Sequence, residues 1–154
     1  MSEKFGLDFR IVDAAMLRDL RRTRGLGANP FRVFPRLIVS IDWLKRPRAM
    51  GLLREVLPPD SHAYPRRFDL LVIDEVHQCA PSGRGRYAID SQRTTAIREL
   101  APHFEHRLFL SATPHNGYTE SFTALLELLD PQRFARGVTP KPETLASAIV
   151  RRLK

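Results

Sequence analysis

Short apolar runs alternate with amphipathic stretches along the chain, and this alternation restricts the fold more than any other feature. Four apolar runs are typical of buried strands: residues 9–13, 36–41, 68–74 and 107–112. The stretches between them carry apolar residues three and four positions apart, which predicts helices. Continuous apolar strands separated by helices are typical of a parallel sheet covered on both faces. We therefore expect an α/β fold of three α/β/α layers with a mostly parallel sheet.

Local capping and breaking signals set the boundaries of the expected helices. Asp13 and Ser91 stand where a side-chain oxygen can cap a helix. Pro47 is expected to interrupt a helical stretch, because proline lacks the amide donor that a helix interior needs. The expected helices cover 13–24, 42–57, 91–101, 118–129 and 142–154, the last within a closing segment over 137–154. On the fourth, the inward face is expected to carry Phe122, Leu125, Leu126 and Leu129.

Length and composition are those of one folded domain. The chain has 154 residues, of which 43% are hydrophobic and 27% are charged, values typical of a soluble globular protein. No apolar run approaches the length of a membrane span, and the start does not resemble a signal peptide. Cys79 is the single cysteine, so an internal disulfide is excluded. This fits a reducing compartment, and we expect a cytoplasmic protein.

The basic charge of the chain suggests a polyanionic partner. The formal net charge is +8, and all but four of the 25 basic residues are arginines. Arginine presents a planar fork of donors that suits phosphate groups, so nucleic acid is the natural partner. A genome rich in G and C would also favour arginine codons over lysine codons whatever the function. The arginines are spread along the chain, and the charge is therefore mild support only.

Two adjacent carboxylates, Asp74 and Glu75, end the apolar run 68–74. Burying unpaired carboxylates costs several kcal/mol each, unless a cation lies between them. Because the carboxyl ends of parallel strands meet at one edge of a sheet, we expect these residues to lie near Ser111 and Thr113, which follow the run 107–112. Either the carboxylates are solvated at a strand end without function, or this edge holds a metal ion.

An aspartate that ends a buried strand and is followed by glutamate is the Walker B arrangement of nucleotide hydrolases. In it the aspartate holds Mg²⁺, usually through water, and the glutamate orients and deprotonates the attacking water. Magnesium retains several waters, so one protein carboxylate suffices. Asp74 is thus the predicted magnesium ligand and Glu75 the predicted catalytic base. Pairing of His77 with Cys79 as a metal site is excluded, because no second ligand pair has suitable spacing.

Two strings in the sequence resemble a known family. "VIDEVH" at 72–77 and "LFLSATPHNG" at 108–117 resemble motifs II and III of the superfamily-two DEAD/DEAH-box helicases. The longer string "RTTAIRELAPHFEHRLFLSATPHNG" is most similar to the Swi/Snf-like branch of double-stranded DNA translocases, especially its bacterial members. A narrower resemblance is to the helicase subunit of the DISARM anti-phage system. The resemblance implies a RecA-like P-loop NTPase lobe with ATP and Mg²⁺ as cofactors.

Carried over by position, the resemblance also implies roles for residues beyond the two carboxylates. His77 would sense nucleotide, while Ser111 and Thr113 would link hydrolysis to movement on DNA. The remaining candidates would contact double-stranded DNA without sequence specificity: Ser40, Lys45, Arg46, Arg84 and Arg86. An alternative without function remains equally open for four of them. Ser40 and Lys45 could belong to a solvated helix start, and Arg84 and Arg86 to a solvent-exposed loop.

The sequence contains no G-x-x-x-x-G-K-[ST] string, which would cradle the phosphates of ATP. We therefore expect residues 1–154 to form the C-terminal part of a first motor lobe, incomplete at its N-terminus. The P-loop segment and the second motor lobe are the expected partners, and a separate chain could supply them. Alone, the chain is expected not to hydrolyse ATP. Two alternatives remain: a non-catalytic remnant that binds DNA or a partner subunit, and a motor fragment of a restriction or RNA-remodelling enzyme.

Overall fold

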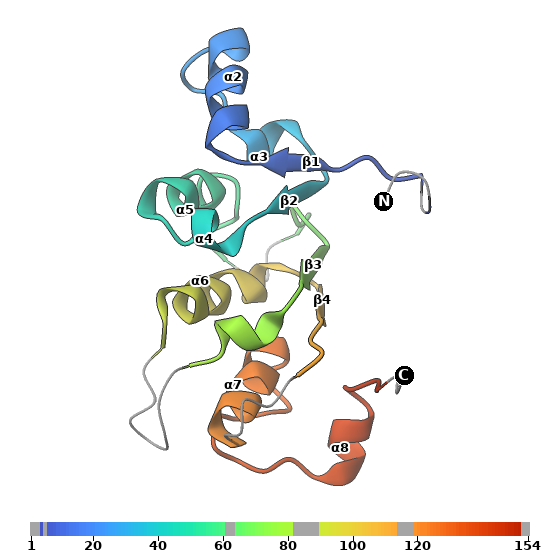
Figure 1. The fold of residues 1–154 in the computed structure, drawn as a ribbon. Coiled ribbons are helices and arrows are strands. Elements are labelled where there is room, and N and C mark those ends of the chain that lie inside the picture. Colours follow the sequence, from blue (N-terminus) through green and yellow to red (C-terminus); the bar gives the residue numbers. More distant parts are fainter. Residues whose placement is uncertain (1–3, 5, 61–63, 82–89, 114–118, 152–154) are drawn as a thin grey trace. The chain divides into compact units, whose positions relative to one another are not determined.

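The structure is a computed structural model and describes residues 4, 6–60, 64–81, 90–113 and 119–151 (Figure 1). Arg84 and Arg86, two of the predicted DNA contacts, lie outside these residues. The chain divides into two compact units. Unit 1 comprises Met1–Asp69 with Pro102–Glu105, and unit 2 comprises Leu70–Ala101 with His106–Lys154.

Unit 1 is built around two short parallel strands. Strand β1 (Arg10–Val12) pairs with β2 (Leu37–Val39), with Ile11 opposite Ile38. Helices α2 (Ala14–Arg24) and α3 (Pro30–Val33) lie between these strands in the sequence, and α4 (Ile41–Leu44) and α5 (Pro47–Arg54) follow β2. Both strands fall inside the predicted runs, and their parallel pairing is the one predicted.

The helices of unit 1 begin where the local signals predict. The carboxylate of Asp13 accepts a hydrogen bond of 2.7 Å from the amide of Met16, and Gly25 ends α2 with a φ of 92°. Pro47 is the first residue of α5, so the predicted helix over 42–57 is divided into α4 and α5. Buried Asn29 caps α3 and also donates from its Nδ2 atom to the carbonyl of Leu52, at 2.7 Å.

Unit 2 contains the second pair of parallel strands. Strand β3 (Leu70–Ile73) pairs with β4 (His106–Phe109), and the 3₁₀ turn η1 (Val76–Cys79) follows β3. The remaining elements are α6 (Gln92–Leu100), the 3₁₀ turn η3 (Ala101–His103), α7 (Thr119–Leu129) and α8 (Pro142–Ala146). Helix α7 contacts both β4 and η1. Ser91 caps α6 as predicted, in a reciprocal capping box with Thr94.

The apolar face of α7 forms much of the core of unit 2. Phe122 and Leu126 pack with Phe134, and three residues at and after α8 cover this cluster: Leu145, Ala148 and Ile149. Leu125 is buried as predicted, but Leu128 is buried in place of Leu129, which is half-buried. Helix α8 is shorter than the predicted closing helix and ends at Ala146.

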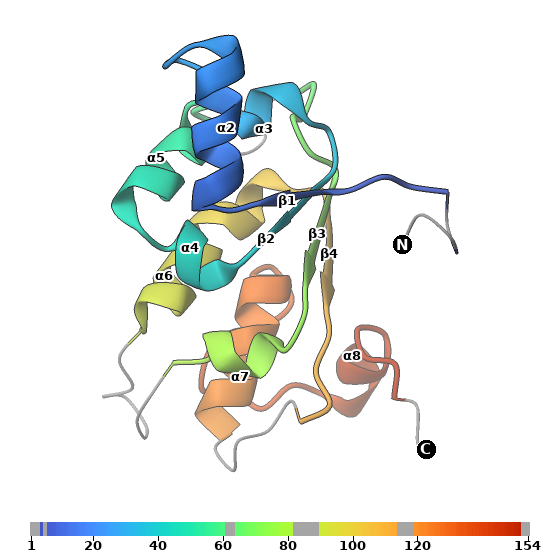
Figure 2. The same cartoon turned by 45° about the horizontal axis from the view of Figure 1, so that its top comes forward.

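One face of each strand pair carries exposed apolar side chains, although the sequence predicts helices on both faces of the sheet. Ile11 and Ile38, which are opposite one another, keep 66% and 45% of their surface exposed, and Val72 and Leu108 keep 48% each. Figures 1 and 2 show α6 and α7 on the same side of the β3–β4 pair. The α/β class with parallel pairing is confirmed, but within the described residues each strand pair keeps large apolar side chains exposed on one face.

None of the helices in the described residues is long and apolar enough to cross a membrane.

Candidate functional site

Asp74 and Glu75 lie at the carboxyl end of β3, exposed to solvent. Pairing with the neighbouring segment continues around them: the amide of Leu110 donates to Ile73 at 2.8 Å, and that of Val76 donates to Leu110 at 3.0 Å. The two carboxylates therefore project from a backbone that is held on both sides. The energetic cost of burying them does not arise, because they face water at the strand end.

Glu75 has an unusual backbone conformation. Its φ of 48° and ψ of 43° place it in the left-handed region, the only such non-glycine residue among those described. This conformation costs a side-chain-bearing residue roughly 1–2 kcal/mol. The bonds of Ile73 and Val76 to Leu110 fix the turn on either side, and the amide of Glu75 donates to Asp74 Oδ1 at 2.9 Å. Backbone strain of this kind is often found at functional sites.

His77 connects the two predicted motifs. Its Nδ1 atom lies 3.0 Å from Ser111 Oγ and 3.2 Å from Glu75 Oε2. The amide of Thr113 in turn donates to Ser111 Oγ at 3.2 Å. A protonated Nδ1 can donate to either oxygen, whereas an unprotonated Nδ1 can accept only from the serine hydroxyl. These contacts form a continuous polar chain from the carboxylate after β3 to the segment after β4.

The arrangement brings together the residues expected at this edge, with a different pattern of contacts. A serine hydroxyl at this edge can hydrogen-bond to the neighbouring carboxylates, but in the described residues that of Ser111 contacts the ring of His77 and the amide of Thr113. The imidazole lies between the serine and Glu75 because η1 turns His77 back toward the strand ends. The roles assigned to these residues stay predictions.

The described residues contain no cluster of three or more His, Cys, Asp or Glu side chains that could enclose a metal ion. Cys79 is 2% exposed and belongs to the core. Asp74 offers one exposed carboxylate, of which Oδ1 already accepts from an amide. These hard oxygen donors fit an ion that keeps most of its waters, as Mg²⁺ does, and do not fit one that needs a complete protein cage.

Sequence reasoning missed a cluster of four charged residues in unit 2. Arg98 contacts Asp90 at 3.1 Å and Glu127 at 2.6 Å. Arg136 Nη1 contacts Asp90 at 3.1 Å, and its amide donates to Glu127 at 2.8 Å. Burial opposes ionisation of Glu127, but the hydrogen bond from Arg98 and the other contacts outweigh it and lower the pKa of Glu127. We call these four residues the paired cluster.

The predicted DNA contacts that the structure describes lie in unit 1. Ser40 precedes α4, and its exposed hydroxyl makes no capping bond. The Nζ atom of Lys45 lies 2.9 Å from Asp42, so this lysine is already paired. Arg46 is exposed and lines a pocket that the sequence did not predict.

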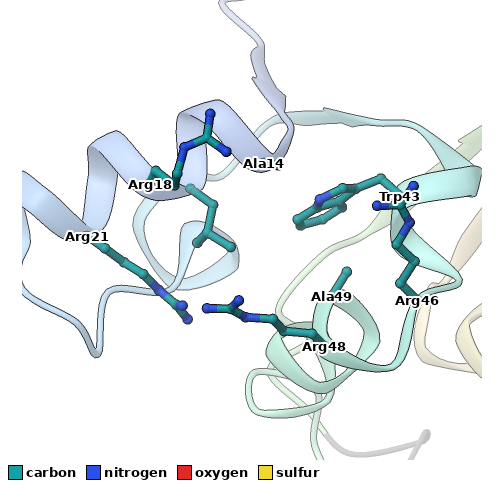
Figure 3. A pocket seen from close by; sticks show the side chains of 8 residues that line it. Ala14, Arg18, Arg21, Trp43, Arg46, Arg48 and Ala49 are labelled. Carbon is teal, nitrogen blue, oxygen red and sulfur yellow. The ribbon is translucent and has the colours of Figure 1, made fainter.

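This pocket lies between α2 and the α4–α5 segment and has a volume of about 280 Å³ (Figure 3). Four arginines and a tryptophan line it together with smaller apolar side chains; the five are Arg18, Arg21, Arg46, Arg48 and Trp43. We call it the arginine pocket. The three-residue spacing of Arg18 and Arg21 places them on one face of α2, which the sequence could have indicated. Their approach to the α4–α5 segment depends on how the helices pack.

Sequence comparison identifies relatives of the chain. RNA polymerase-associated protein RapA from Pasteurella multocida is 31% identical over 136 residues. The proteins of the same name from Serratia proteamaculans and Yersinia enterocolitica are 32% and 34% identical over 134 and 136 residues. The chain is homologous to a segment of RapA. No protein-family model matches the chain.

The match to RapA is extensive for this chain and limited for RapA. It covers 87% of the chain but only 13% of the RapA from Pasteurella multocida and 12% of the other two. The homology therefore includes both units of the chain. It concerns a small part of RapA, and the association with RNA polymerase in the name of RapA refers to that whole protein.

Proposed function

We propose that this chain forms part of the first motor lobe of an ATP-dependent DNA helicase or translocase. The parallel α/β fold, the RapA homology and the meeting of the two predicted motifs support this proposal. The observation that carries it is the contact of His77 with both Ser111 and Glu75. Such a contact is what a motor needs if a change at the nucleotide is to move a second segment.

The carboxylates would divide the work at the nucleotide. Bound ATP with Mg²⁺ supplies the phosphoanhydride bond whose hydrolysis drives the motor. Asp74, exposed and with its Oδ2 oxygen without a partner among the described residues, would hold the waters around the ion. Glu75, fixed by its left-handed backbone, would orient the attacking water and accept its proton.

His77 and Ser111 would transmit the state of the nucleotide. When Glu75 turns toward an attacking water, its Oε2 oxygen can no longer accept from His77 in the present geometry. The imidazole then depends on Ser111, whose oxygen also holds the amide of Thr113. A change at the carboxylate thus alters the start of the segment that follows β4. Movement on DNA would use this link.

Finer assignments remain predictions. They include the preference for duplex DNA, membership of the DISARM system, a cytoplasmic location, and the RNA-remodelling or restriction alternatives. The name of RapA makes RNA polymerase a further partner to test for the complete protein.

The decisive experiment measures ATP hydrolysis by this chain assembled with the segment that supplies a phosphate-binding loop. We expect Mg²⁺-dependent hydrolysis that duplex DNA stimulates. Glu75→Gln should lower it roughly 10²–10⁴-fold, because the base is lost while the shape is kept. Glu143→Gln, a matched change at an exposed residue of α8, should have no effect. Equal rates in the two variants would exclude the proposed base and with it the proposed motor site.

A further inference from the structure

The arginine pocket concentrates positive charge without the anions that usually accompany it. Within the described residues, none of its four guanidinium groups forms an ion pair or a hydrogen bond. The Nε atom of Arg21 is buried and lacks a hydrogen-bond partner among the residues that the structure describes. A buried polar atom without a partner costs roughly 1–3 kcal/mol, which a bound acceptor would recover. The pocket therefore lacks a hydrogen-bond acceptor that the described residues do not supply.

The side chains around the pocket converge on a common space. Figure 3 shows the guanidinium groups of Arg21 and Arg48 pointing toward one another, although they come from different helices. Arg18 and Arg46 add charge at the rim. Like charges that face one another repel, and an anion between them converts this repulsion into attraction.

The shape and the lining of the pocket restrict the anion. Guanidinium forks bind phosphate oxygens in pairs, and four of them exceed what a single carboxylate can neutralise. Trp43 is half-buried and points into the space between the helices, where its ring offers a surface for a planar group (Figure 3). Leu17 and Ala49 are buried and form an apolar part of the wall. The volume of about 280 Å³ is near the lower limit for small-molecule pockets.

We propose that the arginine pocket binds a nucleoside phosphate unit, with the phosphate between Arg21 and Arg48 and the base against Trp43. The unit can come from a free nucleotide or from an unpaired nucleotide of a nucleic-acid strand, since both present the same groups. This site is separate in its residues from the carboxylates after β3. It shares Arg46 with the predicted DNA contacts, but it adds recognition of a base, which the proposed motor function does not include.

Trp43 is the single tryptophan of the chain, and its fluorescence therefore reports on the pocket. The purified chain is titrated at low salt with AMP, with inorganic phosphate and with a short oligo(dT) strand. We expect AMP and the strand to change the emission in a saturable way. Inorganic phosphate should compete with AMP without producing the same spectral change, because it lacks the base.

Substitutions distinguish a built pocket from general attraction to a basic protein. Arg48→Gln and Arg21→Gln should each weaken AMP binding at least tenfold. Arg24→Gln, a matched control on the exposed end of α2 outside the pocket, should change it less than twofold. Circular dichroism confirms that the variants remain folded. Equal weakening by all three variants, or no saturable change with any probe, would overturn the proposal.

Three further results complete the test. A strand that binds more than tenfold tighter than AMP, with a steep salt dependence, identifies nucleic acid as the source of the nucleotide; equal binding identifies the free nucleotide. An acidic peptide that saturates the signal as tightly as AMP would overturn the nucleoside assignment. Glu75→Gln should leave AMP binding unchanged, so failure of the motor proposal and failure of this one are distinguishable.

Discussion

The two units of the chain use arginine in opposite ways. In the paired cluster of unit 2, two arginines meet two carboxylates, and each guanidinium has a partner. In the arginine pocket of unit 1, four arginines surround one space, and no carboxylate of the described residues lines it. In unit 2 the balanced charges hold segments together, whereas the excess positive charge in unit 1 is what the proposed anionic ligand would neutralise.

The paired cluster joins parts of unit 2 that are distant in the sequence. Asp90 and Arg136 are 46 residues apart, and Arg98 of α6 contacts Glu127 of α7. The side chains are a quarter to two-fifths exposed, so solvent screens the attraction. These contacts mainly hold α6, α7 and the segment after α7 in place relative to one another.

The largest effect is expected from breaking the paired cluster. Arg98→Met should lower the free energy of unfolding by about 1–2 kcal/mol, because Asp90 and Glu127 each lose one of their two donors. The matched substitution Arg18→Met in the arginine pocket should change it by less than about 0.5 kcal/mol. Urea unfolding followed by circular dichroism measures both. Equal losses would show that the two regions do not differ as described.

A smaller effect is expected from acid. Since the pKa of Glu127 is lowered below its ordinary value of 4.5, its ionised form stabilises the folded state above that pH. This contribution should be lost as the pH falls below about 4.5 and through the lowered value. Thermal unfolding between pH 3 and pH 7 should therefore show a shallower acid loss in Glu127→Gln than in the parent chain. Arg48→Gln should leave the slope unchanged, and identical slopes in all three proteins would contradict the pairing.

The smallest effect is expected from relieving repulsion in the arginine pocket. Arg48→Gln should leave the stability unchanged or raise it by a few tenths of a kcal/mol at low ionic strength. Added salt should remove this difference, because it screens exposed charges. Unfolding midpoints at two salt concentrations provide the measurement. A clear loss of stability would indicate that Arg48 has a structural partner and that the pocket is not a site of unbalanced charge.

Local signals predicted the parts of the fold that depend on neighbours in the sequence. Asp13 and Ser91 cap α2 and α6, and Pro47 divides the predicted helix over 42–57 into α4 and α5. Each of these signals acts within three or four residues of the chain. The predicted closing helix is shorter than expected. Its first turn has the proline start at Pro142, but beyond Ala146 the segment packs through Ala148 and Ile149 instead of continuing the helix.

Parallel pairing also allowed the candidate site to be located before its geometry was known. The sequence by itself determined that Asp74, Glu75, Ser111 and Thr113 follow neighbouring strands, because apolar runs separated by helices place their carboxyl ends together. Only the tertiary structure decided that His77 lies between Glu75 and Ser111, and that arginines of α2 meet those of the α4–α5 segment. Capping and strand patterns act over a few residues, whereas these contacts depend on how whole helices and turns pack.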